Sequence, residues 1–184
     1  MQVGFYFDQN RCIGCYTCVV ACKDWHDIEA GAASWCKVTT SEYGKFPDVH
    51  VSFSFSACYH CANPTCISVC TVGAISKRKK DGIVVVNGEE CLGKDACGLC
   101  LEACPFEAPQ FGNEQGAKMQ KCDLCQDRLA DSKKPVCVTA CRTRALDFGD
   151  VDKLIEKYGN IRPVKEFNYS KDSRPSIIYR PKVF

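Results

Sequence analysis

The sequence predicts an α+β protein built from two small cysteine-rich modules, one nested inside the other, with an extended C-terminal tail. Three observations support this class. Of the 17 cysteines in 184 residues, all but Cys36 fall into four separate runs of four. Short segments with strand character lie before the first run, between the second and third runs, and after the fourth. A proline-containing segment without helical periodicity ends the chain.

The four runs share a spacing that indicates their chemistry. Each closes with a Cys-x3-Cys step and contains a Cys-x2-Cys step. The runs are Cys12, Cys15, Cys18 and Cys22; Cys58, Cys61, Cys66 and Cys70; Cys91, Cys97, Cys100 and Cys104; and Cys122, Cys125, Cys137 and Cys141. Three thiolates from a tight loop and a fourth from the next helical turn suit a cubane of iron and sulfide, because soft irons prefer thiolate ligands. The first run has the spacing of bacterial ferredoxins, so the modules are expected to be ferredoxin-like, of the bacterial 2[4Fe-4S] type.

The elements around the runs follow from local patterns. Residues 3–8 predict a strand entering the first run, and residues 145–148 predict one leaving the fourth, so the two could pair. Residues 49–56 alternate apolar and polar side chains, which is typical of a half-buried strand leading into the second run. The residues within each Cys-x3-Cys step should form short helical turns.

A hairpin is expected between the second and third runs. Residues 74–76 and 83–86 have strand character and flank Asp81-Gly82, a turn sequence. The basic run of residues 77–80 is then most simply the solvated arm of this hairpin, with a docking patch as the alternative.

A helix is expected after the fourth run. Asp150 can cap it and Gly159 can end it, with Leu154 on its apolar face. Residues 161–184 should be extended, without a core of their own, and should lie on this chain or on a partner.

The nesting follows from the way such runs work in pairs, because in two-cluster ferredoxins the fourth cysteine of a run binds the other cluster. The inner module is predicted over residues 49–117 and the outer module over residues 1–48 and 118–150, with a C-terminal helix and tail over 151–184. Four [4Fe-4S] clusters are expected. Their expected ligands are Cys12, Cys15, Cys18 and Cys141 for the first; Cys58, Cys61, Cys66 and Cys104 for the second; Cys91, Cys97, Cys100 and Cys70 for the third; and Cys122, Cys125, Cys137 and Cys22 for the fourth.

Two other uses of so many cysteines are disfavoured. Cysteines three residues apart are poorly placed to form local disulfides, and the first residues lack the pattern of a secretory signal. Zinc sites need two knuckles per ion and no recurrent Cys-x3-Cys tail. Cys36 is expected to be a partly buried free thiol.

The remaining composition narrows the possible functions. A formal charge of +2 gives no basic footprint for nucleic acid, and no apolar stretch is long enough to span a membrane. Clusters are loaded where thiols stay reduced, so assembly is expected in the cytoplasm, with either retention there or co-export to the periplasmic face on a signal-bearing partner.

Several residues near the runs could have functional roles. His26, His50 and His60 are expected to be structural, because each run already supplies four cysteines. His60 and Tyr59 could face a partner. Trp25 and Trp35 are expected to pack or to shield clusters from water.

Four segments resemble a known family. They are Cys-Ile-Gly-Cys-Tyr-Thr-Cys at 12–18, Cys-Tyr-His-Cys-Ala-Asn-Pro-Thr-Cys at 58–66, Ala-Cys-Pro-Phe-Glu-Ala-Pro-Gln-Phe at 103–111 and Lys-Cys-Asp-Leu-Cys at 121–125. The chain resembles the four-cluster iron–sulfur (beta, electron-transfer) subunit of the dimethyl sulfoxide reductase family of molybdenum or tungsten oxidoreductases, over residues 3 to about 160. The resemblance implies four clusters in a row, with a bis-pterin molybdenum or tungsten catalytic subunit at one end and a quinone-linked membrane subunit or a soluble carrier at the other.

The third run departs from the family pattern. Its first gap, from Cys91 to Cys97, is three residues longer than usual, and we expect the insertion to bring Lys94 and Asp95 close to that cluster. Thr71 and Arg142 also replace prolines that often follow the second and fourth runs in relatives.

The sequence therefore predicts an electron-transfer subunit with no catalytic residues of its own. A free-standing polyferredoxin that shuttles between enzymes is the main alternative, and a zinc-stabilised interaction module is a third. The extended tail favours a subunit.

Overall fold

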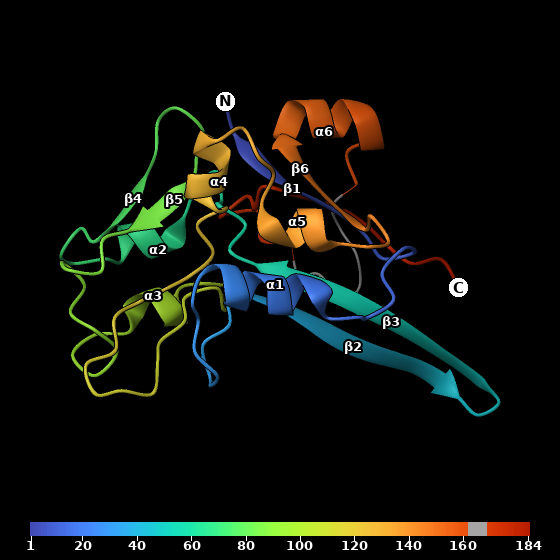
Figure 1. Cartoon of the computed structure of the whole chain (residues 1–184), viewed down its shortest axis with the longest axis horizontal. Coiled ribbons are helices and arrows are strands. Elements are labelled where there is room, and N and C mark those ends of the chain that lie inside the picture. Colours follow the sequence, from blue (N-terminus) through green and yellow to red (C-terminus); the bar gives the residue numbers. More distant parts are fainter. Residues whose placement is uncertain (162–168) are drawn as a thin grey trace.

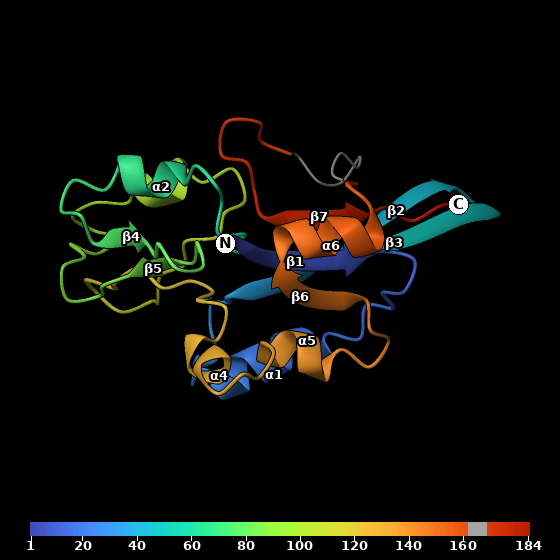
Figure 2. The same cartoon turned by 90° about the horizontal axis from the view of Figure 1, so that it is seen from above.

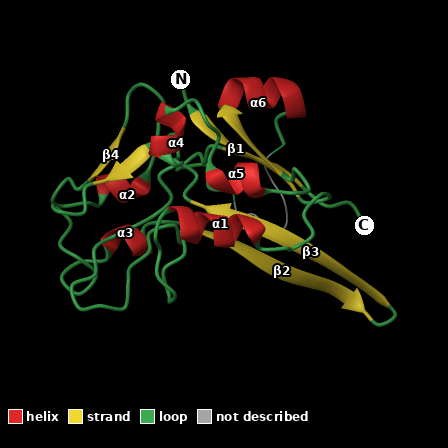
Figure 3. Cartoon of the chain, in the orientation of Figure 1, coloured by secondary structure: helices red, strands yellow, loops and turns green. Residues whose placement is uncertain are grey.

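The computed structural model describes residues 1–161 and 169–184. Its strands and helices are all short, and most of the chain runs in loops around the cysteines (Figures 1 and 3). In chain order the elements are β1 (Val3–Asp8), α1 (Thr17–Trp25), β2 (Cys36–Lys45), β3 (Asp48–Ala57), α2 (Thr65–Ser68), β4 (Ile75–Lys77), β5 (Val84–Val86), α3 (Leu99–Glu102), α4 (Gln126–Ala130), α5 (Val136–Ala140), β6 (Leu146–Asp150), α6 (Val151–Tyr158) and β7 (Ile177–Arg180).

The central sheet joins both ends of the chain, in the order β6-β1-β7. β1 pairs antiparallel with β6 and parallel with β7. The pairing of residues 3–8 with the strand after the fourth run confirms the sequence prediction. The aromatic side chains of β1 supply much of the core, with the ring of Phe7 5.1 Å from that of Tyr179 on β7 and the ring of Phe5 5.6 Å from that of Phe55 on β3.

The strand at residues 177–180 corrects the expectation of a tail without a core. Ile177, Ile178 and Tyr179 are buried, and their strand forms one edge of the central sheet. The segment is extended as predicted, but it lies in the core of this chain. It therefore gives no support for a partner.

Two further sheets are hairpins. β4 and β5 pair antiparallel around Asp81 and Gly82, as predicted, and Gly82 takes the positive φ of 74° that such a turn requires. β2 and β3 form a longer hairpin that projects from the body of the molecule (Figure 1). The strand over residues 48–57 was predicted, whereas its partner over residues 36–45 was not.

The short helices at the Cys-x3-Cys steps confirm the predicted helical turns, and they pack in pairs. α1 from the first run packs on α5 from the fourth, and α2 from the second run packs on α3 from the third. Figure 2 shows α1 and α5 below the central sheet, with α2 beside β4 and β5 at the other end of the molecule.

Helix α6 begins and ends as predicted. The Asp150 carboxylate accepts hydrogen bonds from the backbone N–H groups of Asp152 and Lys153, and Gly159 follows the last turn with a φ of 84°. Leu154 and Tyr158 pack on the central sheet, where the ring of Tyr158 stacks on that of Tyr6.

Candidate iron–sulfur centres

Three cavities are each lined by four cysteines. In every case three come from one run and the fourth is the last cysteine of another run. The linings include Cys12, Cys15, Cys18 and Cys141 in the first cavity; Cys58, Cys61, Cys66 and Cys104 in the second; and Cys70, Cys91, Cys97 and Cys100 in the third. We call these the first, second and third groups. The cavities have similar volumes of about 360, 370 and 390 Å³, counting space open to solvent.

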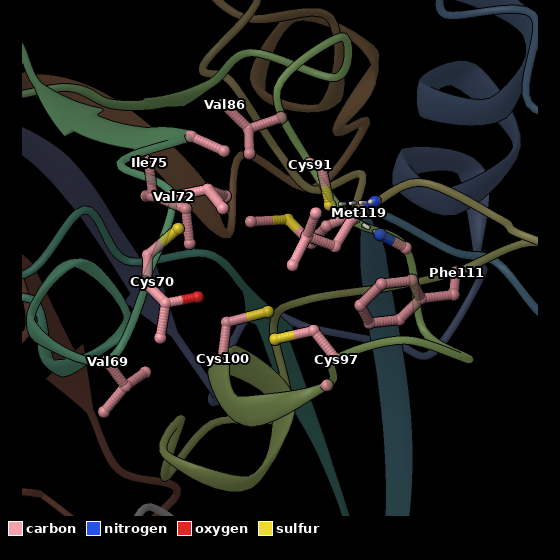
Figure 4. A pocket seen from close by; sticks show the side chains of 15 residues that line it. Val69, Cys70, Val72, Ile75, Val86, Cys91, Cys97, Cys100, Phe111 and Met119 are labelled. Atoms are coloured by element: carbon pink, nitrogen blue, oxygen red, sulfur yellow. Dashed lines mark hydrogen bonds between the residues drawn. The ribbon is translucent and has the colours of Figure 1, made fainter.

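The third cavity shows the arrangement most clearly (Figure 4). Its four sulfur atoms enter from separate segments, and apolar side chains such as Ile75, Phe111 and Met119 supply most of the remaining wall. A dry site with four soft sulfur ligands suits an iron–sulfur cluster.

The four remaining cysteines of the runs form the fourth group, which consists of Cys22, Cys122, Cys125 and Cys137. All four are buried. Burial raises the pKa of the Cys137 thiol well above its usual value, and the charges of Cys125 and Cys22 raise it further, which indicates that the three sulfur atoms lie close together. Burial and the charge of Cys137 do the same to the pKa of Cys122.

The sulfur atoms within a group are too widely spaced for one zinc ion. Ligands 2.3 Å from a tetrahedral zinc are roughly 3.8 Å apart. Within the described part of the chain, the one set of three or more candidate ligand atoms lying within 4.8 Å of one another is His26, Asp123 and Cys125, which includes a single cysteine. A larger metal cluster fits this spacing better than a single ion.

Backbone N–H groups point at several sulfur atoms. The nitrogen of Ala145 lies 3.2 Å from the sulfur of Cys141, and that of Gly93 lies 3.4 Å from the sulfur of Cys91. Residues with positive φ curl these loops, including Tyr16 at 58°. Such N–H···S bonds raise the reduction potential of a cluster held by those sulfurs.

Burial keeps most of these thiols protonated in the metal-free chain. It raises the pKa to about 12 at Cys18, Cys61 and Cys125, with neighbouring thiolates adding to the effect. Cys15 is the exception, because hydrogen bonds from Thr17 lower the pKa of its exposed thiol. Metal binding therefore has to displace protons from buried sulfur.

The four groups lie in a row. The first and fourth groups meet where α1 packs on α5, and the charge of Cys18 is felt at Cys137. The fourth and second groups meet at Cys122 and Cys58, which interact electrostatically. The second and third groups share the pair of helices α2 and α3. The order along the molecule is first, fourth, second and third.

His26 is a neighbour of the fourth group that sequence reasoning did not single out as functional. Its Nε2 lies 3.3 Å from the sulfur of Cys125 and 3.8 Å from the Asp123 carboxylate. The signal was present in the sequence, because His26 follows Cys22 by one helical turn.

The expectation that Tyr59 and His60 could face a partner is wrong. Both are buried, with exposed fractions of 2% and 0%. The Nδ1 of His60 accepts a hydrogen bond from the Val84 N–H, and burial lowers the pKa of the ring well below its usual value, so His60 is neutral. His50 lies on the β2–β3 hairpin, with its ring 4.8 Å from that of Phe184.

Two tryptophans hydrogen-bond across the molecule. The indole N–H of Trp25 donates to Asp127, and that of Trp35 donates to Gln120. Trp35 packs beside His26 and against the hydrophobic core that contains cysteines of the first and fourth groups, which agrees with the packing role expected of it. Trp25 remains partly exposed beneath the guanidinium of Arg128.

The insertion in the third run presents its charges away from the third cavity. The Asp95 carboxylate accepts a hydrogen bond from the Gly116 N–H, and the side chain of Lys94 is exposed and does not line the cavity. In the basic run, Lys77 donates to the carbonyls of Cys61 and Ala62, and Arg78 pairs with Asp81.

None of the helices described is long and apolar enough to cross a membrane.

Comparisons with known proteins agree with this geometry. A family described as a 4Fe-4S dicluster domain matches residues 49–151, and a 4Fe-4S binding domain matches residues 3–24. The iron–sulfur chain of the anaerobic dimethyl sulfoxide reductase of Escherichia coli is 40% identical over 98% of this chain and 89% of its own length. The corresponding chain of Haemophilus influenzae is 38% identical over 100% and 91%. A sulfite dehydrogenase subunit of Allochromatium vinosum is 35% identical over 82% and 69%. The chain belongs to the family of iron–sulfur electron-transfer subunits that includes the iron–sulfur chain of anaerobic dimethyl sulfoxide reductase.

Proposed function

We propose that the chain carries four [4Fe-4S] clusters and relays electrons along them. The ligands would be the four cysteine groups described above, the fourth group included. The observation that carries this proposal is the repeated lining of a cavity by three cysteines of one run and the last cysteine of its partner run. When bound, the clusters supply the one-electron chemistry, while the chain fixes their spacing, shields them from water and sets their potentials.

We further propose two nested ferredoxin-like modules. The outer module comprises residues 1–48 and 118–150 and would hold the first and fourth clusters, and the inner module comprises residues 49–117 and would hold the second and third. The packing of α1 on α5 and of α2 on α3 supports this division. The C-terminal residues 151–184 then complete the outer module through α6 and β7.

The partner that we propose is a large catalytic subunit with a pterin-bound molybdenum or tungsten centre. A quinone-linked membrane subunit or a soluble carrier would exchange electrons at the other end of the row. The support is the similarity to polypeptides named as components of a reductase and of a dehydrogenase. Assembly would take place in the cytoplasm, with retention there or export together with a signal-bearing partner.

Metal analysis of the chain purified anaerobically from its native source tests the proposal. We expect brown protein with about sixteen irons and sixteen acid-labile sulfides per chain, and a larger molybdenum or tungsten protein that co-purifies with it. Iron far below this value would contradict the four clusters, and a colourless zinc protein would favour an interaction module. Full iron in a chain that elutes alone would favour a polyferredoxin.

A further inference from the structure

A buried lysine lies between two of the cysteine groups. The side chain of Lys121 is almost fully enclosed, and the residue as a whole is 4% exposed. Its ammonium donates hydrogen bonds to the carbonyl oxygen of Val84 and, at 3.0 Å, to that of Cys122. Two neutral acceptors therefore hold a full positive charge inside the protein.

No carboxylate within residues 1–161 and 169–184 forms an ion pair with this ammonium. Every ion pair in those ranges involves other side chains, and none includes Lys121. A buried charge without a counter-charge is costly, and such groups are normally paired or bound to metal centres. The chain must therefore place negative charge next to Lys121 in some other form.

The surroundings of Lys121 identify that negative charge. Lys121 lines the second cavity together with Cys58, Cys66 and Cys104, and it hydrogen-bonds the backbone of Cys122 in the fourth group. Its charge acts on Cys66, where it opposes the effect of burial on the thiol pKa. The second and fourth groups are adjacent in the row, so Lys121 lies where the outer module meets the inner one.

We propose that Lys121 is the fixed counter-cation between the second and fourth clusters, a positioning residue that raises the reduction potentials of both. This inference rests on the proposed function, because a cluster with four thiolates supplies the missing negative charge. Each cluster becomes more negative by one electron on reduction, so a nearby cation stabilises the reduced form. The effect is strong because the site is buried and poorly screened.

The test is an EPR-monitored redox titration of the anaerobically purified, cluster-loaded chain in its complex. The Lys121→Met variant retains the length of the side chain and removes its charge. We expect it to lower the midpoint potentials of two clusters, each by a tenfold or greater change in the reduction equilibrium, or about 59 mV for a one-electron couple. The Lys121→Arg variant should restore both potentials.

Lys118 provides a matched control. Its ammonium also donates to the carbonyl of a cysteine, Cys91, at 2.8 Å, but its side chain is exposed. Lys118→Met should leave all potentials within a twofold change of the equilibrium, because water screens that charge. Equal shifts in Lys118→Met and Lys121→Met would overturn the proposal, as would an unshifted, fully loaded Lys121→Met protein.

Iron analysis separates this proposal from the proposed function. If the unaltered chain holds far fewer than sixteen irons, the four-cluster function fails, whereas full iron with unshifted potentials sinks only the role of Lys121. If Lys121→Met loses iron, Lys121→Gln and Lys121→Arg decide the matter. Full loading of Arg alone supports the counter-cation, because Arg shares the charge of Lys but not its shape. Loss of iron in all three variants shows a purely structural role.

Discussion

Cys36 shows how a single side chain can lie beside expected cluster ligands without being part of any run. It is 2% exposed, and its thiol donates a hydrogen bond to the sulfur of Cys22. That bond lowers the pKa of Cys22, and together with burial it raises the pKa of Cys36, so the proton stays on Cys36. The free thiol predicted from the sequence is therefore more deeply buried than expected, and it supports a proposed ligand.

Substitution of Cys36 and Cys22 distinguishes the neighbour from the ligand. We expect Cys36→Ala to retain about sixteen irons, and Cys22→Ala to lose the fourth cluster but keep the first, because only Cys22 is placed in a group of four. The double variant Cys22→Ala/Cys36→Ala shows whether Cys36 replaces the missing sulfur. Iron analysis and EPR spectra of the reduced proteins provide the measurement. Loss of the first cluster in Cys22→Ala, with the fourth intact, would refute the pairing of runs.

Two glycines that face each other in the central sheet show what an element tolerates. Gly4 on β1 pairs with Gly149 on β6. A Cβ atom on Gly4 would lie 2.1 Å from the carbonyl oxygen of Ser176, whereas one on Gly149 would lie 3.7 Å from Leu154, an ordinary contact. The chain approaches β1 closely just before β7, where the Phe5 N–H donates to the same Ser176 oxygen.

The pair Gly4→Ala and Gly149→Ala tests this close approach. We expect Gly4→Ala to destabilise the loaded protein by about 1–3 kcal/mol, because the clash is with backbone that cannot rotate away. Gly149→Ala should be neutral within about 0.5 kcal/mol. Thermal melts followed by the visible absorbance of the clusters measure the difference. Equal melting temperatures for the two variants would show that β7 is less firmly fixed than its burial indicates.

Elements with a local signal could be predicted from the sequence, and those that depend on distant contacts could not. The β4–β5 hairpin was predictable because Asp81-Gly82 marks the turn, and β3 because its side chains alternate. β2 has polar and exposed residues on both faces, so only its pairing with β3 reveals it. β7 is a run of four residues whose strand character comes from pairing with β1, at the opposite end of the chain.

The same division applies to the candidate site. The spacing of the cysteines indicated which residues would gather, because each run is a local loop whose geometry depends on few neighbours. The roles of His26 and Lys121 depend on contacts between modules, which spacing does not reveal. For Tyr59 and His60, neighbouring cysteines suggested a surface loop, but the packing of Tyr59 beside Phe106 and the hydrogen bond of His60 with the β5 backbone bury both.

The whole molecule has little conventional core compared with its number of cysteines. The largest buried cluster of side chains includes Cys22, Cys58, Cys122 and Cys137 among its members. The second includes the cysteines of the third group at its edge. Much of the interior is thus formed by the surroundings of the proposed metal sites, so metal binding is also folding energy.

Removal of iron should therefore unfold most of the chain. We expect anaerobic chelation to collapse the dispersion of the amide NMR spectrum, and rebuilding with iron and sulfide to restore it, because metal is the strongest partner that the buried thiols can bind. A mock-treated sample without chelator serves as the control. A well-dispersed spectrum from iron-free protein would show that the aromatic core around Phe5, Phe7 and Tyr179 is sufficient by itself.

The parallel pairing of β1 with β7 has a consequence for biosynthesis. A ribosome releases residues 3–8 among the first of the chain and residues 177–180 among the last, so β1 cannot gain its second neighbour until translation is nearly complete. Throughout elongation one edge of that nascent strand waits for its neighbour. Maturation factors that insert metal would thus meet an open polypeptide, which locks only when its final strand arrives.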